Sequence, residues 1–348
     1  MTLAYIILTI LWLSLIAYAV LGGADFGSGI WDFLASGPLA QRQRLLIEQA
    51  LGPVWEANHV WLIFLIVGLF TAFPSVFATV SVALFLPFTL ILIGIVLRGA
   101  AFVFRAHADG APVLSKFWSR VFSTASTITP FLLGTAAATV ASGQVRTQGG
   151  QVQIDLWRGW TTPFALTIGA MALSLCAVIA AIYLTIEAQN INDRELSEAF
   201  RRRAMIAGTI TGTLNVLGFV LSPSEAPLLW NGMLAHALPA VIATILIGLS
   251  TAAALLLRRY RLARVLIILV TALMVASWGL SQFPYLIPPD VTIANAASPP
   301  ATLLALLISI SIGMVLLLPS LWFLFHVFRG KNSGLLVEKQ RGDNYETN

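Results

Sequence analysis

Long apolar runs alternate with short polar segments along almost the whole chain. A helix that crosses a bilayer needs roughly 20 mainly apolar residues. Nine runs have about that length, and they lie near residues 3–33, 52–73, 76–97, 121–142, 161–186, 204–222, 231–257, 265–287 and 301–328. The second and third are separated only by a tight Phe73-Pro74-Ser75 turn, and without that break the count would be eight. The pattern predicts an all-α integral membrane protein of about nine transmembrane helices.

Residues 1–329 read as a single membrane domain, because no linker or short-period repeat divides them. Residues 330–348 are polar and lack periodicity, so we expect a disordered cytoplasmic tail.

The composition supports a lipid environment. The 348 residues are 58% hydrophobic and 10% charged, whereas soluble proteins carry roughly 25% charged residues. The Lys and Arg residues form short clusters between the apolar runs, which argues against nucleic-acid binding. The single cysteine, Cys176, lies inside an apolar run and excludes an internal disulfide, so we interpret it as a buried structural thiol.

The positions of the basic residues predict an orientation, because cytoplasmic loops are enriched in Lys and Arg. With nine spans and the N-terminus outside, every one of the 20 lysines and arginines except Arg146 and Arg158 falls on the cytoplasmic side. A count of eight would scramble this bias. We therefore expect the N-terminus outside and the C-terminus in the cytoplasm.

The first span carries an acid in a glycine-rich segment, Gly22-Gly23-Ala24-Asp25-Phe26-Gly27-Ser28-Gly29. An acid inside a span is costly and needs a protein partner or a function. Two glycines four apart let a neighbouring backbone approach closely. Asp25 is therefore expected to face protein, as a proton carrier or as a hydrogen-bonding clamp between helices. Four residues are expected to shape its site: Gly22, Gly23, Gly27 and Gly29.

The second span opens on the densest chemistry of the chain, Gly52-Pro53-Val54-Trp55-Glu56-Ala57-Asn58-His59-Val60-Trp61. Glu56 and His59 are three residues apart and share a helix face. Di-iron bundles use the same spacing, but they need further inward glutamates that no other span supplies. A coupled acid and base that exchange protons fit better. Three more residues are expected to shape this site: Trp55, Asn58 and Trp61.

The predicted orientation puts Asp25, Glu56 and His59 in the cytoplasmic halves of their spans. They are therefore candidates for one proton relay that opens to the cytoplasm. Asp32, beyond Trp31, is expected to be a solvated charge at the end of the first span. Solvated positions are also expected for three glutamates at helix ends or in a connector, Glu48, Glu187 and Glu225.

Histidines are too few for a haem-rich subunit. His236 and His326 are candidate haem ligands, although a packing or interfacial role is more common for such residues. His107 lies in a predicted cytoplasmic loop. We expect this chain to bind no cofactor or metal.

The two polar motifs resemble those of cytochrome bd oxidase subunit II. The stretch from Leu21 to Gly29 is similar to that family's N-terminal motif, and the stretch from Gly52 to Ile63 resembles its Trp-acid-x-Asn-x-Val-Trp element. The resemblance implies two four-helix bundles plus one peripheral helix, in the bacterial plasma membrane. It also implies a partner, subunit I, that carries haem b, haem d and the quinol site, and leaves room for a small accessory subunit.

The implied reaction is oxidation of quinol and reduction of dioxygen to water, with protons taken from the cytoplasm so that turnover charges the membrane. Glu56 would be the family's internal proton carrier, and Asp25 matches its first-helix aspartate. This chain has Leu21 and Gly22 where some relatives have another acid, and His59 where other members have glutamine.

Two alternatives come from other functional classes. A glycine-rich break beside an acid could line the substrate site of a proton-coupled transporter, although no second such element follows residue 170. The chain could also be a purely structural subunit that supports a catalytic partner.

Overall fold

The computed structural model describes the chain except for residues 52–54, 107–111, 149–150, 156, 158 and 346–348. The side chains of 51, 55–57, 106, 112, 148 and 324–345 are also outside the described part. The longer helices are α1 (Thr2–Phe33), α2 (Ala40–Leu51), α3 (Trp55–Ala72), α4 (Pro74–Ala83), α5 (Phe85–Ala106), α6 (Pro112–Ala141), α7 (Pro163–Asn190), α8 (Arg194–Glu225), α10 (Leu238–Leu256), α11 (Tyr260–Gln282) and α13 (Pro300–Tyr345).

The shorter elements connect these helices. They are α9 (Pro227–Gly232), the π-helix η1 (Met233–Ala237), α12 (Ile293–Ala296) and four strands, β1 (Arg146–Gln148), β2 (Gln151–Gln153), β3 (Tyr285–Ile287) and β4 (Val291–Thr292). The strands form two antiparallel hairpins, β1 with β2 and β3 with β4.

Within the described residues, 8 helices are long and apolar enough to cross a membrane, and the count reaches 9 when the bent pair α3 and α4 is taken as one span. The chain bends by 118° between the two helices of the pair. Pro74 begins α4, and because proline lacks an N–H and clashes with the preceding turn, it cannot continue α3. The bounds predicted for the third span, 76–97, are therefore wrong. That segment holds the short α4 and only the first part of α5, which runs to Ala106.

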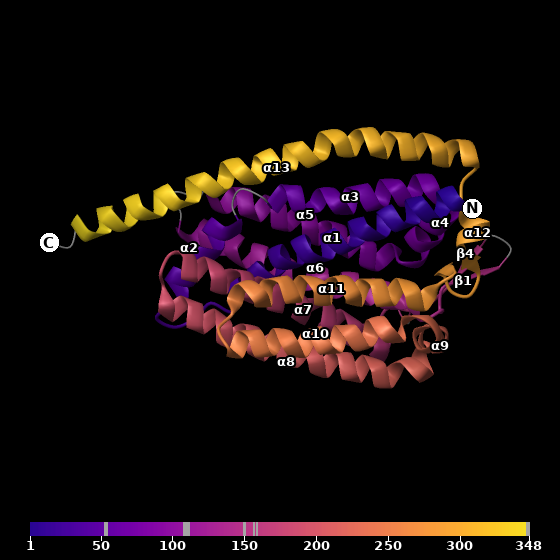
Figure 1. Cartoon of the computed structure of the whole chain (residues 1–348), viewed down its shortest axis with the longest axis horizontal. Helices are drawn as coiled ribbons and strands as arrows, with labels where there is room; N and C mark the ends of the chain where they lie inside the picture. The colour runs from indigo at the N-terminus through magenta and orange to yellow at the C-terminus, as the bar shows by residue number, and fades with distance from the viewer. Residues whose placement is uncertain (52–54, 107–111, 149–150, 156, 158, 346–348) are drawn as a thin grey trace.

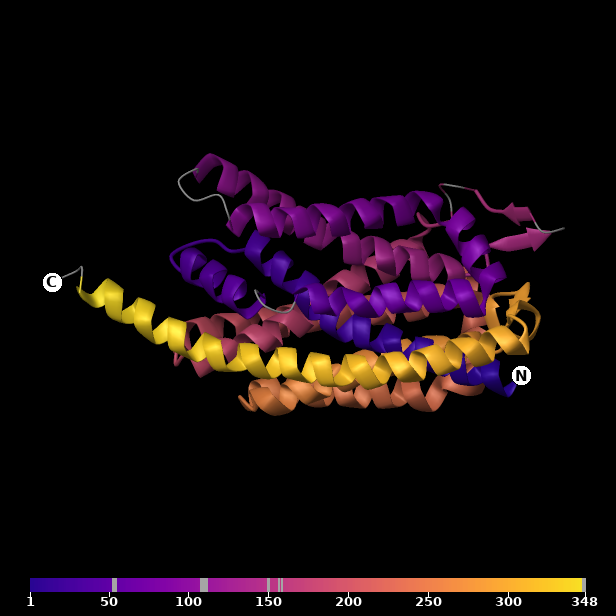
Figure 2. The same cartoon turned by 90° about the horizontal axis from the view of Figure 1, so that it is seen from above.

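The long helices lie roughly side by side (Figures 1 and 2). Helix α1 packs against α3, α6 and α7, and α5 packs against α6; α7 also packs against α6, α8 and α11, and α10 packs against α11. Helix α13 lies along α3 and α1. The all-helical membrane fold agrees with the prediction, whereas the division into two four-helix bundles and one peripheral helix stays a prediction. The disordered tail after residue 329 stays a prediction.

Glycines on α1 allow α7 to approach closely. A Cβ built on Gly27 would lie 1.9 Å from the carbonyl oxygen of Cys176 and 2.7 Å from the Cβ of Ala180. At Gly23 a Cβ would lie 3.2 Å from the end of Ile179. The obstacle at Gly27 is backbone, which cannot turn aside as a side chain can. The expected close approach of a neighbouring helix is confirmed.

Replacing Gly27 with alanine should lower the thermal unfolding temperature, because α1 and α7 must separate to admit the new methyl group. Overpacking typically costs about 1–3 kcal/mol, and a clash with backbone lies at the upper end of that range. Gly208 is a matched control in helix α8, since a Cβ built there meets nothing within 4 Å. Gly208→Ala should leave the unfolding temperature unchanged or slightly raised, because alanine favours helix by about 1 kcal/mol. Equal unfolding temperatures for the two variants in detergent would contradict the close contact.

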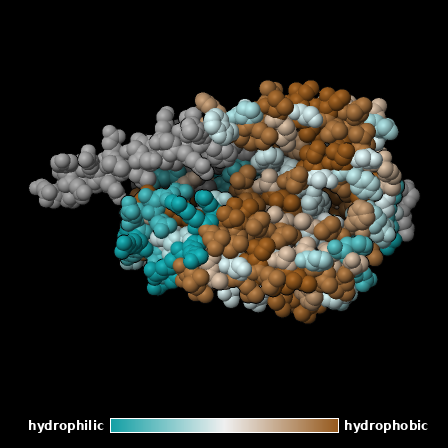
Figure 3. Space-filling view, viewed as in Figure 1, coloured by the Kyte–Doolittle hydropathy of each residue, from teal (hydrophilic) through white to brown (hydrophobic). Residues whose placement is uncertain are grey.

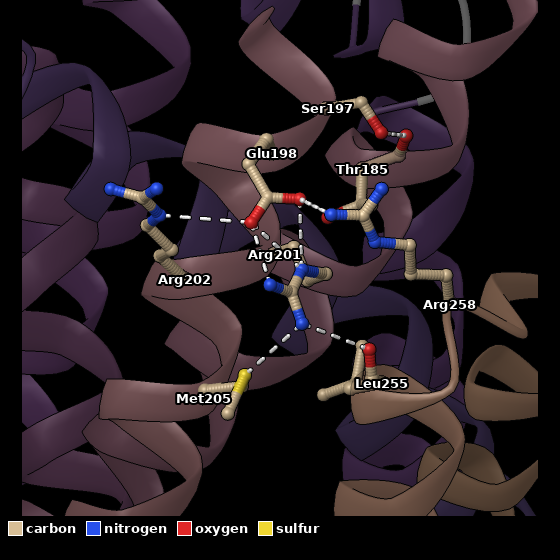
Figure 4. Close-up of polar contacts among 8 residues, drawn as sticks. All are labelled: Thr185, Ser197, Glu198, Arg201, Arg202, Met205, Leu255 and Arg258. Atoms are coloured by element: carbon tan, nitrogen blue, oxygen red, sulfur yellow. Dashed lines mark hydrogen bonds and ion pairs between the residues drawn. The ribbon is translucent and has the colours of Figure 1, made fainter. Parts of the chain in front are cut away.

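Hydrophilic residues gather at one end of the bundle, at the left of the view (Figure 3). There Glu198 on α8 accepts hydrogen bonds from Arg201 and forms an ion pair with Arg202 (Figure 4). It also pairs at 3.5 Å with Arg258, which lies in the turn between α10 and α11. Arg42 of α2 pairs with Asp193 and Glu195, which lie just before and at the start of α8. Segments predicted to share one side of the membrane therefore meet.

Arg146 lies at the opposite end of the bundle, where it pairs with Asp290 at 3.0 Å. The hydrogen bonds donated by Arg146 lower the pKa of Asp290. Arg146 is thus separated from the basic residues of α2, α8 and the α10–α11 turn, as the charge bias predicted. Which end faces the cytoplasm stays a prediction.

Candidate functional site

A buried polar cluster lies where α1, α3, α5 and α6 meet. The Asp25 side chain on α1 is fully buried, and one carboxylate oxygen lies 2.7 Å from Nη2 of Arg98 on α5. The other oxygen lies 3.7 Å from Nε2 of His59 on α3, which is itself 3.3 Å from Nη1 of Arg98. An acid, a base and a permanent cation therefore contact one another inside the membrane-spanning part of the chain.

Arg98 is fixed by every element around it. Its Nε donates a hydrogen bond to Oγ of Ser126 on α6 at 3.0 Å. The guanidinium carbon lies 5.1 Å from the ring centroids of both Phe26 and Phe122, at the distance of cation–π contacts. Gly29 makes room for Ser126, since a Cβ on Gly29 would lie 2.3 Å from the serine hydroxyl. The arginine thus holds a single position that compensates the charge of Asp25.

The Asp25 carboxylate is held by charge more than by directed hydrogen bonds. Neither oxygen accepts a well-aligned hydrogen bond from any residue that the structure describes, even though Nη2 of Arg98 is at 2.7 Å. A buried carboxylate oxygen without a donor is unfavourable unless it takes a proton or a water. His59, at 3.7 Å from the carboxylate, is the other described side chain of the cluster that can carry a proton. The cluster therefore holds two proton-carrying side chains beside one permanent cation.

Arg98 is the residue that the sequence reasoning missed. It was counted among the cations of a cytoplasmic loop, and that assignment is wrong: Arg98 lies within α5 and is only 2% exposed. The sequence did contain a signal, because the apolar run continues past Arg98 through Ala100, Ala101 and Phe102 to Phe104. A cation within an apolar run requires a buried acid as partner.

Asp32 is also not where it was expected. We predicted a solvated charge, whereas Asp32 is 2% exposed. Its Oδ2 accepts hydrogen bonds from Oγ of Ser123 at 2.9 Å and from Nη1 of Arg105 at 3.3 Å. The reason is that α5, α6 and the connector helix α2 extend past the end of α1 and cover it, as the contact with Arg44 at 3.9 Å shows.

The other predicted site residues have different outcomes. Trp55 and Glu56 begin helix α3, but their side chains lie outside the described residues, so the link from Glu56 to the cluster stays a prediction. Asn58 and Trp61 are half-buried on α3. The carbonyl of Trp61 accepts a hydrogen bond from Ser14 of α1 at 2.9 Å, which holds the two helices together. Gly22 lies beside the ring of Tyr18, 3.0 Å from a built Cβ.

The described histidines differ in their surroundings, and whether any of them binds haem stays a prediction. His59 has Nε2 directed at Arg98 and Asp25, and its ring packs against Tyr18 and Phe26. His236 is exposed on η1, and His107 and His326 lie outside the described side chains. No group of three His, Cys, Asp or Glu side chains suited to a metal occurs in the described part of the chain.

The glutamates expected at solvated ends are more engaged than predicted. Glu225 accepts a hydrogen bond from the backbone N–H of Phe164 at 3.0 Å, so it caps the beginning of α7. Glu48 is half exposed and lies 3.8 Å from Arg105. Glu187 is half-buried and lies 3.4 Å from the side-chain amide of Asn190.

Comparisons with known proteins show which protein family this chain resembles. A family model described as cytochrome bd terminal oxidase subunit II matches residues 3–328. A provisionally named cytochrome bd menaquinol oxidase subunit II of Bacillus subtilis (strain 168) is 24% identical over 334 residues, which are 93% of this chain and 95% of that protein. The cytochrome bd-I ubiquinol oxidase subunit 2 of Escherichia coli (strain K12) is 24% identical over 201 residues, 57% of this chain and 51% of the relative.

The fold also matches a solved structure. A chain in the structure of the bd oxidase from Geobacillus thermodenitrificans superposes with a TM-score of 0.75 at 22% identity. The match covers 95% of this chain and 100% of that one.

Proposed function

The chain belongs to the cytochrome bd terminal oxidase subunit II family, and on that premise we propose that Asp25, His59 and Glu56 carry protons from the cytoplasm toward the oxygen-reducing centre of the complex. The chain is a multi-pass subunit of a terminal quinol oxidase in the bacterial plasma membrane, and its partner is subunit I. The finer parts of the proposal are that subunit I holds haem b and haem d, that the complex oxidises quinol and reduces dioxygen to water, and that a small accessory subunit can join it.

The need for protons follows from the reaction. Reduction of dioxygen to water consumes one proton for each electron, and taking those protons from the cytoplasm charges the membrane. Haem supplies the electron transfer and oxygen chemistry in such a complex. Residues in this chain would contribute by holding and moving protons.

The contact of Asp25, His59 and Arg98 is the observation that supports the proposal. Asp25 and His59 lie 3.7 Å apart and are largely removed from water, so a proton can pass between them directly or through one water. Arg98 keeps its charge whether Asp25 is protonated or not, because a guanidinium does not lose its proton in proteins. The arginine therefore keeps a fixed position beside the carboxylate, at 2.7 Å.

Two other functions compete with this one. A transporter is not favoured, since the family model covers nearly the whole chain. A purely structural role is the direct competitor, because a buried ion pair also clamps helices together. The experiments must therefore separate proton transfer from assembly.

Replacing Glu56 with glutamine should slow quinol-driven oxygen consumption by about tenfold or more, because glutamine cannot carry a proton and general acid–base groups contribute about 10²–10⁴ to rates. The variant should be measured in membrane vesicles, with oxygen uptake and membrane charging recorded together. Subunit I should still co-purify, since glutamine preserves the shape of the side chain.

Thr71→Ala is the control for this measurement. It removes a polar side chain from the same helix without removing an acid, and the Thr71 hydroxyl donates to the carbonyl of Val67 at 2.8 Å. Turnover should therefore stay within about twofold of wild type. Normal turnover and membrane charging in Glu56→Gln would remove Glu56 from the path.

A further inference from the structure

We propose that Asp32, together with Arg105, Ser123 and Glu48, forms the mouth of the proton path at the charged end of the bundle and passes protons inward to Asp25. The inference rests on the proposed function and extends it to residues that neither motif contains. Asp32 is a buried acid that the path through Asp25, His59 and Glu56 does not use.

The geometry around Asp32 repeats the geometry around Asp25. Each acid of α1 pairs with an arginine of α5, Asp25 with Arg98 and Asp32 with Arg105. A serine of α6 completes each layer: Ser126 accepts from Arg98, and Ser123 donates to Asp32. The two aspartates are seven residues apart, as are the two arginines, so each pair lies on one face of its helix, about 10 Å apart along the axis.

The two serines, one in each layer, connect the layers along α6. Ser123 and Ser126 are three residues apart on α6, so their hydroxyls share a face. Both are buried, at 2% and 0% exposure. Gly29 carries no side chain at the point where Ser126 meets α1. A hydroxyl both donates and accepts, so this row can bridge the two acids together with water, whereas a step of about 10 Å between carboxylates is too long for direct transfer.

Each acid keeps an oxygen that can take up a proton. Oδ1 of Asp32 and both oxygens of Asp25 accept no hydrogen bond from any described residue. The charged groups that face Asp32 are Arg105 of α5 and Arg44 of α2, with Glu48 behind Arg105. Two cations beside one buried acid compensate its charge, while its second oxygen stays open to a water or to a hydroxyl.

The outer layer is open at the surface of this chain, as a mouth requires. The side chains of Arg44 and Glu48 on α2 are 49% and 46% exposed, and Arg105 is 16% exposed. The inner layer is closed, with Arg98 at 2% and Asp25 at 0%. Exposure therefore falls from α2 through Asp32 to Asp25. A latch that only fixed α2 would not need a second acid aligned with the first.

The test uses the complex with subunit I in proteoliposomes, with oxygen consumption and proton uptake measured in H₂O and D₂O. Asp32→Asn should lower turnover about tenfold and raise the solvent isotope effect, because a carboxylate-dependent transfer becomes limiting. Asp32→Glu should restore turnover to within about twofold of wild type. Glu195→Gln, which removes an exposed acid paired with Arg42 at the same end, should leave turnover and isotope effect unchanged.

A second variant guards against misfolding. Asp32→Asn with Arg105→Gln removes both charges, so no charge is left buried alone. It should assemble with an unchanged haem spectrum and remain slow. Asp25→Asn added to Asp32→Asn should be at most about twofold slower than the slower single variant, because the times of two steps in series add, whereas independent effects would multiply.

The outcomes separate this inference from the proposed function. Normal turnover in Asp32→Asn with slow turnover in Asp25→Asn would overturn the mouth and leave the proposed function standing. Normal turnover in both would sink the proposed function itself. Failure of Asp32→Glu to restore turnover, with the isotope effect unchanged throughout, would make the layer a structural latch and overturn the inference.

Discussion

An Asp25→Asn complex should keep subunit I and its haem spectrum yet reduce dioxygen at least about tenfold more slowly than wild type. Asparagine has the size of aspartate, and its amide oxygen can still accept from Arg98. The amide cannot take up a proton, so the exchange with His59 across 3.7 Å is lost. Quinol-driven oxygen consumption and membrane charging in proteoliposomes measure the effect.

Ser28→Ala is the matched control for Asp25→Asn. Ser28 is also buried on α1, and its hydroxyl donates only to the carbonyl of Ala24, at 2.8 Å. Losing that hydrogen bond costs about 1 kcal/mol of stability without removing an acid. Turnover should therefore stay normal in Ser28→Ala. If Asp25→Asn also kept normal turnover and membrane charging, the subunit would be a structural support and the proton path would be wrong.

Much of the fold could be predicted because membrane helices are encoded in local hydropathy. The spans, the grouping of basic residues at one end, and the burial of Asp25 all follow from the cost of placing polar groups in lipid. The nearness of Asp25 and His59 was also within reach. The predicted orientation put both residues in the same half of the membrane, and the paired glycines of the first span indicated a close helix neighbour.

Helix pairing could not be predicted in the same way. Hydropathy does not tell which helix faces which, so Arg98 was assigned to a loop by its distance from the preceding span. The error in the third span has the same source. Pro74 ends one helix, but the sequence does not show that α4 turns by 118° and delays the next span until Phe85. Once α5 is shifted to 85–106, Arg98 falls inside it and Arg105 near its end.

Asp32 illustrates a second limit. Its position near the end of α1 indicated a solvated charge, but burial there depends on α2, α5 and α6, which cover that end of the helix. Elements distant in the sequence decided whether that carboxylate met water. The same holds for Glu225, which caps α7 across 61 residues of sequence.

The Asp25–Arg98 pair should show an asymmetry in stability that distinguishes charge compensation from proton transfer. Removing one partner of a buried ion pair costs about 3–5 kcal/mol, because the other charge stays buried. Asp25→Asn leaves Arg98, which cannot lose its proton. Arg98→Met leaves Asp25, which can become neutral by binding one. Asp25→Asn should therefore lower the thermal unfolding temperature more than Arg98→Met, although a cost of this size still leaves a folded complex when stability is about 5–15 kcal/mol.

The double variant Asp25→Asn with Arg98→Met should regain most of the stability lost in Asp25→Asn, since no charge then remains buried and the methionine fills the space between Phe26 and Phe122. Oxygen consumption should stay as slow as in the single Asp25→Asn variant, because the acid is still missing. Unfolding temperatures of the purified complexes and their turnover in vesicles provide the two readouts. Recovery of turnover together with stability would mean that the pair serves assembly alone, whereas recovery of stability without turnover assigns Arg98 to charge compensation and Asp25 to proton transfer.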